Sequence, residues 1–182
     1  MINVRTEPFA PADRAACLAI FDANTPGAFI GRERDEFSEF LDDPGGQYWV
    51  VRDPDALVVA CGGADLLAGG RFGVMTWTMV LPNWQRQGLG SRLTRTALEY
   101  VAATPRAERV VLETSNLSAP FYERHGFQTT MVTPDHYAPG VHRHNMALEL
   151  TDSVRQQLLG APRHDQSRRH NAEKRNGQGE AP

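Results

Sequence analysis

Between residues 71 and 103 the sequence passes from a strand pattern, through a turn that contains two glycines, into a helix pattern. The run "RFGVMTWTMV" (71–80) is rich in β-branched and aromatic residues and stops just before Pro82, which cannot extend a central strand. From Leu89 to Val101 an apolar residue recurs every four positions, which is typical of a helix with one apolar face. We therefore expect a sheet strand whose following helix, 90–103, lies back on the sheet.

Periodicity and turn residues predict the remaining elements in the same way. The expected strands are 2–5, 47–52, 56–66, 109–115, 127–132 and 142–150, and the expected helices are 11–24, 33–41 and 119–127. Strands 47–52 and 56–66 read as a hairpin, whereas 133–141 reads as a loop between the last two strands. Ser118 is placed to cap helix 119–127. This order favours an α+β fold with a largely antiparallel sheet and helices on its faces.

Composition limits the class of protein. The 182 residues are 41% hydrophobic, enough for one core, and residues 1–159 are expected to form the single domain. Residues 160–182 contain almost no apolar side chains and are predicted to be a disordered tail. No apolar run is long enough to cross a membrane and the first residues do not resemble a leader, which predicts a cytoplasmic protein without membrane partners.

Charge and cysteine usage narrow the range of partners further. The net charge is −3; the tail carries five basic and three acidic residues, which leaves −5 for residues 1–159. An acidic domain argues against a nucleic-acid partner. Cys17 and Cys61 belong to no Cys or His motif, so neither a metal site nor a disulfide is predicted.

Turns with glycines that open a helix bind phosphate in several unrelated classes of protein. A nucleoside-triphosphate loop needs a lysine after its glycine, but the only lysine in the chain is Lys174. A dinucleotide fingerprint needs Gly or Ala three residues after Gly90, where this chain has Leu93. The remaining class binds pyrophosphate through backbone amides at a helix start, here those from Arg86 to Ser91.

Two segments resemble one family. Gln85-x-x-Gly88-x-Gly90 is similar to the acetyl-CoA signature of the GNAT superfamily of N-acetyltransferases, Gln/Arg-x-x-Gly-x-Gly/Ala. The later segment "ETSNLSAPFYERHGF" (113–127) resembles a second element of that family, and the resemblance covers roughly residues 1–150. It implies an acetyl-CoA-dependent enzyme without a metal. The implied fold is the GNAT fold, a mixed, mostly antiparallel sheet of six to seven strands with helices on both faces.

The resemblance also implies roles for individual residues. Tyr122 would be the general acid that protonates the leaving thiolate, because a phenol stays protonated at neutral pH. The pantetheine arm would pair with the backbone of Met79 and Val80, and one of their amides is the candidate oxyanion donor. The implied cofactor-binding residues are Met79, Val80, Gln85, Arg86, Gln87, Gly88, Leu89, Gly90, Ser91 and Asn116.

The base that accepts the proton of the amine stays open. Strand 71–80 contains no carboxylate, so Glu113 on the next strand is the main candidate. His136, Tyr137 and ordered water are the alternatives. The acidic segment "ERDEFSEFLDD" (33–43) is expected to border the acceptor site, where it would attract a cationic amine.

Three functions fit these residues. The first is acetyl transfer from acetyl-CoA to a primary amine of a small molecule, by direct attack in a ternary complex. The second has the same chemistry on a protein N-terminus or a lysine side chain. The third is an acyl-CoA-binding module without turnover. A homodimer is compatible with each of them.

Overall fold

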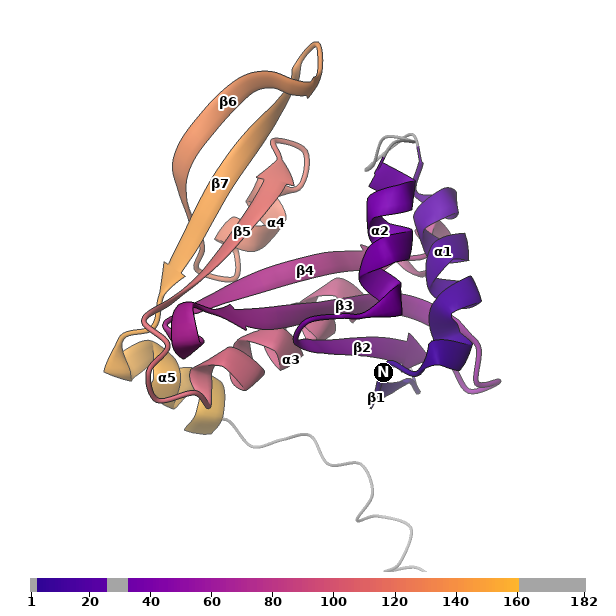
Figure 1. Cartoon of the computed structure of the whole chain (residues 1–182), viewed down its shortest axis with the longest axis horizontal. Coiled ribbons are helices and arrows are strands. Elements are labelled where there is room, and N and C mark those ends of the chain that lie inside the picture. The colour runs from indigo at the N-terminus through magenta and orange to yellow at the C-terminus, as the bar shows by residue number, and fades with distance from the viewer. Residues whose placement is uncertain (1–2, 26–32, 161–182) are drawn as a thin grey trace, which may run out of the picture.

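The computed structural model describes residues 3–25 and 33–160 and contains one seven-stranded sheet with the order β1-β2-β3-β4-β5-β7-β6 (Figure 1). All neighbouring strands are antiparallel except β4 and β5. The predicted α+β fold with a mostly antiparallel sheet is thereby confirmed. The strands are β1 Arg5–Pro8, β2 Gln47–Arg52, β3 Val58–Leu67, β4 Phe72–Val80, β5 Arg109–Ser115, β6 Gln128–Ala138 and β7 Val141–Glu149.

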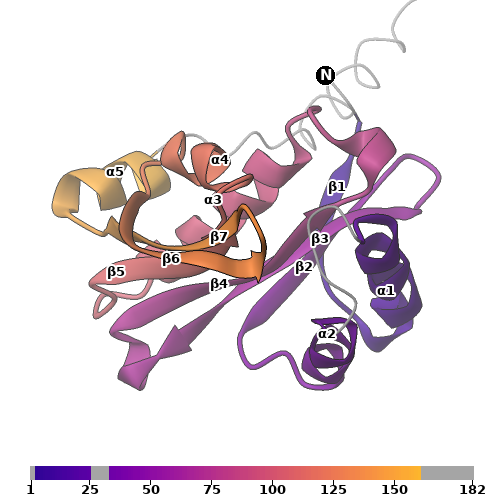
Figure 2. The same ribbon diagram turned by 90° about the horizontal axis from the view of Figure 1, so that it is seen from above.

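Helices cover both faces of the sheet, as predicted (Figure 2). Helices α1 and α2 lie on one face, and α3, α4 and α5 lie on the other. The expected stripe from Leu89 to Val101 is buried against the sheet. The described helices are α1 Arg14–Ala23, α2 Glu33–Asp42, α3 Leu89–Ala102, α4 Ala119–Glu123 and α5 Asp152–Gly160, with short 3-10 turns at Pro11–Asp13, Ala68–Gly70 and Pro82–Trp84.

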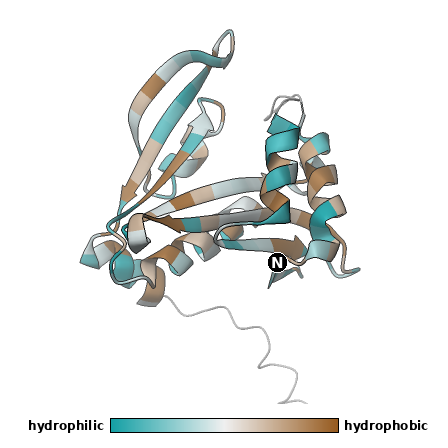
Figure 3. Cartoon of the chain, in the orientation of Figure 1, coloured by the Kyte–Doolittle hydropathy of each residue, from teal (hydrophilic) through white to brown (hydrophobic). Residues whose placement is uncertain are grey.

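The core under α1 and α2 is aromatic. Phe37 is fully buried and stacks on Phe21, with the ring centroids 5.7 Å apart, and Trp77 of β4 packs on the same ring at 5.1 Å. In Figure 3 both helices alternate between hydrophobic and hydrophilic residues, as expected for helices that bury only one face. None of the described helices combines the length and the apolar character that crossing a lipid bilayer requires.

Two predictions at the ends of the chain were wrong. The predicted strand 2–5 begins outside the described residues; within them the first strand is Arg5–Pro8, whose residues pair with β2. Strand β6 runs to Ala138, so most of the predicted loop 133–141 is strand. The chain turns only at Gly140, which has φ +77°, while Asp135 at φ +52° forms an irregularity inside the strand and accepts a hydrogen bond from the Gly140 amide at 2.7 Å.

Helix α5 was missed and the Ser118 cap was wrong. Helix α5 has few apolar residues, but Arg155 donates to the carbonyl oxygens of Ala102 and Thr104 at 2.6 and 3.2 Å and so fastens it to α3. The Ser118 side chain makes no capping bond, and α4 ends at Glu123. The predicted disorder of the tail concerns residues 161–182, which lie outside the described part of the chain.

Candidate functional site

Strands β4 and β5 separate soon after they meet. They pair over three residues only, Phe72 to Val74 opposite Arg109 to Val111, and then diverge (Figure 1). A cavity of about 1020 Å³ occupies the split and is lined by the backbone and side chains of both strands. Because neither strand covers the split, the cavity connects the two faces of the sheet.

A bulge in β4 borders this cavity. Gly62 of β3 lies opposite two residues of β4, and one of these, Trp77, has φ +40°, a value that non-glycine residues rarely adopt inside a strand. A Cβ atom on Gly62 would lie 2.9 Å from Oγ1 of Thr78, so only glycine fits at this position. The bulge was not predicted, although two adjacent glycines within a strand pattern are a signal for one.

The backbone N–H and C=O of Val80, at the end of β4, point toward the cavity. The Leu81 amide donates to the Val59 carbonyl of β3 at 2.9 Å. Because backbone groups alternate in direction along a strand, the N–H and C=O of Val80 face away from β3, toward the split. By the same alternation the Met79 amide faces β3.

A buried polar side chain holds the Val80 carbonyl in place. Asn24, 9% exposed at the end of α1, donates to the carbonyls of Ile20 and Val80 at 2.8 and 3.1 Å. Its oxygen accepts a hydrogen bond from Nε2 of Gln85, which also lies 3.2 Å from the Val80 carbonyl. No local sequence pattern assigns this role to Asn24, because its partners are remote in the chain.

The two glycines of the turn are constrained to different degrees. Gly88 has φ +86° and open space around a hypothetical Cβ, so the backbone conformation selects it. A hypothetical Cβ on Gly90 would lie 3.4 Å from the Phe121 ring, which is an ordinary contact, so packing alone does not require glycine there. The first amide of α3 to bond back along the helix is that of Arg92, to the Gly88 carbonyl. The amides before it belong to the first turn, whose N–H groups a helix leaves for other partners.

Tyr122 of α4 also lines the cavity in the split. Its ring packs on Phe121 and Phe127, with centroids 5.0 and 5.8 Å away. Burial raises the pKa of the Tyr122 phenol, and a hydrogen bond with the Thr78 side chain opposes part of that rise. The phenol therefore stays protonated at neutral pH, as a general acid must.

Helix α4 is also joined to the glycine turn. Nε2 of His125 lies 3.1 Å from Oγ of Ser91, which is hydrogen-bond distance. Burial lowers the pKa of His125, and the nearby Arg124 charge lowers it further. This contact fixes the position of Tyr122 relative to the start of α3.

On the α1–α2 face the cavity is lined by Glu33, Glu113 and Tyr137, and this side of the cavity is called its mouth on that face. Glu113 points to this face because its neighbour in β5, Leu112, is buried among α3 to α5. Its carboxylate accepts a hydrogen bond from Asn145 at 2.8 Å and forms an ion pair with Arg143 at 3.6 Å. Arg143 Nε and Asn145 Oδ1 are buried and have no hydrogen-bond partner among the described residues.

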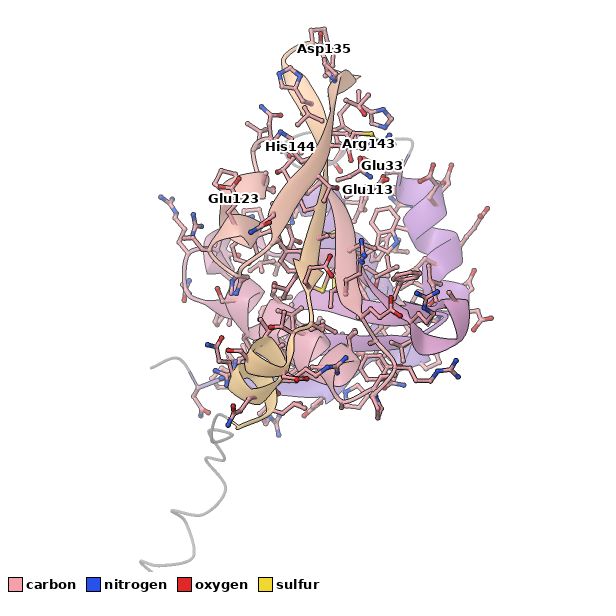
Figure 4. All side chains as sticks on the ribbon, turned by 90° about the vertical axis from the view of Figure 1, so that its left-hand side faces the viewer. Glu33, Glu113, Glu123, Asp135, Arg143 and His144 are labelled. Carbon is pink, nitrogen blue, oxygen red and sulfur yellow. The ribbon has the colours of Figure 1, made fainter. Side chains whose placement is uncertain are left out.

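Tyr137 of β6 and Glu33 of α2 complete this mouth. The pKa of Tyr137 is raised by burial and by the negative charges of Glu113 and Glu33, and Arg143 lowers it in part. Glu33, Glu113 and Arg143, which are labelled in Figure 4, therefore all act on the Tyr137 phenol.

The structure brings most of the predicted site residues together and separates a few. The cavity is lined by Met79, Val80, Gln85, Arg86, Gly88, Leu89, Gly90, Ser91, Glu113 and Tyr122, all of which were predicted as site residues. Gln87 instead donates to the Asn83 carbonyl at 3.0 Å. Asn116 bonds to the backbone of His142 and Gly140 at 2.9 and 3.3 Å, which ties the β6–β7 hairpin to β5. The contacts of all these residues with a cofactor stay predictions. The alternative base His136 is exposed and does not line the cavity.

Residues 44–129 match the family model of the acetyltransferase (GNAT) domain. This stretch, just under half of the chain, thus matches a GNAT acetyltransferase domain, and the chain has the GNAT fold, which confirms the predicted resemblance and fold. No curated protein matches the sequence significantly. Within the described ranges, no three His, Cys, Asp or Glu side chains gather as metal ligands do.

Solved structures share this fold. A protein assigned to the GNAT family, from Desulfovibrio desulfuricans, is 23% identical with a TM-score of 0.70 over 82% of this chain and 100% of its own. The ribosomal-protein-S18-alanine N-acetyltransferase of Escherichia coli is 15% identical with a TM-score of 0.69, over 82% and 95%. An aminoglycoside 6'-N-acetyltransferase in complex with coenzyme A is 15% identical with a TM-score of 0.67, over 81% and 97%.

Proposed function

We propose that the chain transfers the acetyl group of acetyl-CoA to a primary amine of a small molecule, by direct attack while both substrates are bound. The observation that carries this proposal is the cavity between β4 and β5, which connects the glycine turn with Tyr122 and continues to the opposite face. Acetyl-CoA supplies the acetyl group as a reactive thioester. A similar fold with bound coenzyme A supports this choice of donor.

The turn and the end of β4 would hold the donor. Backbone amides from Arg86 to Ser91 would bind the pyrophosphate, helped by the positive end of the α3 dipole. The open space beside Gly88 fits this role, because it lets a phosphate approach the backbone closely. Leu89 and Met79 line the same cavity, and Gln85 would act by holding the Val80 peptide.

Two groups would stabilise the reaction. The Val80 amide faces the cavity, so we prefer it to the Met79 amide as the donor to the developing oxyanion. The Tyr122 hydroxyl would give its proton to the departing sulfur, because its raised pKa keeps that proton available. No nucleophilic side chain is needed, since the amine attacks directly.

The amine must lose a proton before it attacks. Glu113 would accept that proton directly or through water, and its ion pair with Arg143 at 3.6 Å would hold the carboxylate in place. Tyr137 is not suited to this task at neutral pH, since its raised pKa keeps the phenol protonated. Glu113 is thus the proposed base, as the sequence suggested.

The test is the release of coenzyme A thiol from acetyl-CoA, followed with a panel of small amines and of peptides with free N-termini or lysines. The proposal predicts turnover with small amines and saturable acetyl-CoA binding in calorimetry. Peptides as the best acceptors would move the function to protein acetylation, and binding without turnover would make the chain an acyl-CoA-binding module. A cytoplasmic location and a homodimer stay predictions.

A further inference from the structure

The carbonyl oxygen of Val80 is occupied by side chains of the protein itself. Nδ2 of Asn24 donates to it at 3.1 Å, and Nε2 of Gln85 donates to it at 3.2 Å. A carbonyl oxygen has two lone pairs and so accepts two hydrogen bonds. Because both are taken, Val80 offers a bound substrate its N–H rather than its carbonyl.

The two side-chain amides also bond to each other. Nε2 of Gln85 donates its other hydrogen to Oδ1 of Asn24 at 3.0 Å, and Asn24 donates its other hydrogen to the Ile20 carbonyl at 2.8 Å. Turning the Asn24 amide over would place its oxygen against two carbonyl oxygens and lose these bonds. The network of Asn24, Gln85 and the Val80 carbonyl therefore has one arrangement of donors and acceptors.

This network joins three separate parts of the fold. Asn24 ends α1, Val80 ends β4, and Gln85 begins the glycine turn after the short 3-10 turn Pro82–Trp84. All three residues line the cavity between β4 and β5. The network thus fixes the start of the glycine turn relative to the end of β4.

We infer that Asn24 and Gln85 are positioning residues for acetyl transfer, which keep the Val80 N–H aligned with the thioester carbonyl while the glycine turn holds the pyrophosphate. The inference rests on the proposed function and adds to it two residues that act through the Val80 backbone. The carbonyl and the N–H of one residue share its Cα atom, so holding the carbonyl limits the directions that the N–H can take.

Such a role affects the rate more than the affinity. The pyrophosphate is held equally before and during the reaction, so its contacts contribute to binding. A hydrogen bond to the oxyanion becomes strong only as negative charge develops on the thioester oxygen. A misaligned Val80 N–H should therefore lower kcat and leave the binding of acetyl-CoA almost unchanged.

The experiment uses Asn24→Ala, Gln85→Ala and the double variant. The release of coenzyme A thiol with the best small amine gives kcat, and calorimetry gives the affinity for acetyl-CoA and the number of sites. We expect kcat to fall at least about ten-fold in each single variant, because small errors in position are costly in catalysis. The affinity should change less than about two-fold. One site per chain shows that the loss of rate does not come from unfolded protein.

The double variant tests whether the two residues act together. Asn24 and Gln85 bond to each other and to one carbonyl, so the loss in the double variant should be close to the larger single loss. Thr25→Ala is the matched control at the end of α1. Thr25 bonds to the Phe21 carbonyl at 3.2 Å and does not line the cavity between β4 and β5, so this variant should keep the wild-type kcat.

Three results would each overturn the inference: an unchanged kcat in both single variants, a loss of acetyl-CoA affinity as large as the loss of kcat, or single losses that multiply in the double variant. If Asn24→Ala does not fold, Gln85→Ala decides the question by its kcat and affinity alone. All of these results require turnover by the wild type. Failure of the proposed function looks different, since the wild type would then acetylate no amine.

Discussion

The two ends of the cavity are built from different parts of the protein. The proposed donor end consists of the turn 85–91 and the end of β4, two stretches close together in the chain, and it offers mainly backbone groups whose direction β4, the turn and α3 define. The proposed acceptor end, on the α1–α2 face, is assembled from the side chains of Glu33, Glu113 and Tyr137, which belong to three elements. A site made of backbone depends on conformation, whereas a site made of side chains depends on residue identity. The first kind can hold a constant donor while the second kind changes with the acceptor.

The largest expected effect lies where the two ends meet. Tyr122→Phe removes the proposed acid, so kcat should fall at least about 100-fold, within the range of general acid catalysis. Acetyl-CoA affinity, measured by calorimetry, should change less than about two-fold, because the ring and its packing on Phe127 are kept. Unchanged turnover would remove Tyr122 from the mechanism, and a parallel loss of affinity would assign it a structural role.

The next effect concerns the connection between α1 and the donor end. Asn24→Ala deletes the bonds to Ile20, Val80 and Gln85, and we expect a loss of about 2 kcal/mol in the free energy of unfolding, because buried polar groups lose their partners. Urea unfolding measures this loss. Thr25→Ala, which removes one bond from a less buried side chain to the Phe21 carbonyl, should cost less. Equal losses in the two variants would show that the Asn24 network has no special weight.

A smaller effect separates backbone from side chain at the turn. Gly88→Ala places a Cβ at φ +86° and should weaken acetyl-CoA binding about ten-fold, about 1.4 kcal/mol, since the amides lose their alignment. Gly69→Ala is the matched control, because Gly69 has φ +64°, open space around a Cβ and no place in the cavity. It should lower stability but keep the affinity. If both variants bind acetyl-CoA equally well, the turn does not hold the donor.

The smallest effect is a dependence on pH. The pKa of His125 is lowered in the folded chain, so between its ordinary value of 6.5 and the folded value the unfolded chain binds more protons. The stabilisation is complete above that ordinary value and is lost as the pH falls through it toward the folded value. His125→Gln should therefore reduce the dependence of the free energy of unfolding on pH below the ordinary histidine value of 6.5. An identical slope in the variant would show that His125 does not contribute.

The donor end could be predicted from the sequence because a local backbone conformation has local requirements. Gly88 and Gly90 identified the turn, and the following apolar stripe identified α3. The acceptor end has no such pattern. The acidic segment 33–43 was expected to border it, but the encounter of Glu33 with Tyr137 depends on how distant elements pack. The bulge at Trp77 and the bonds of Asn24 were missed for the same reason.

The bend of the last hairpin shows a similar limit. Pro134, Asp135, Pro139 and Gly140 are all typical of turns, so the stretch resembled one loop. In the structure only the second pair reverses the chain, because Asp135 bonds to the Gly140 amide and the strand continues between them. The turn residues of this stretch indicate irregular backbone, but the position of the chain reversal depends on the pairing of β6 with β7.

The most direct test is a crystal structure of this chain with coenzyme A. We expect the pyrophosphate within hydrogen-bond distance of the amides from Arg86 to Ser91, and the sulfur in the split between β4 and β5, next to the Tyr122 hydroxyl. Coenzyme A bound outside the split, or with its sulfur remote from Tyr122, would contradict the account of one cavity with a donor end and an acceptor end.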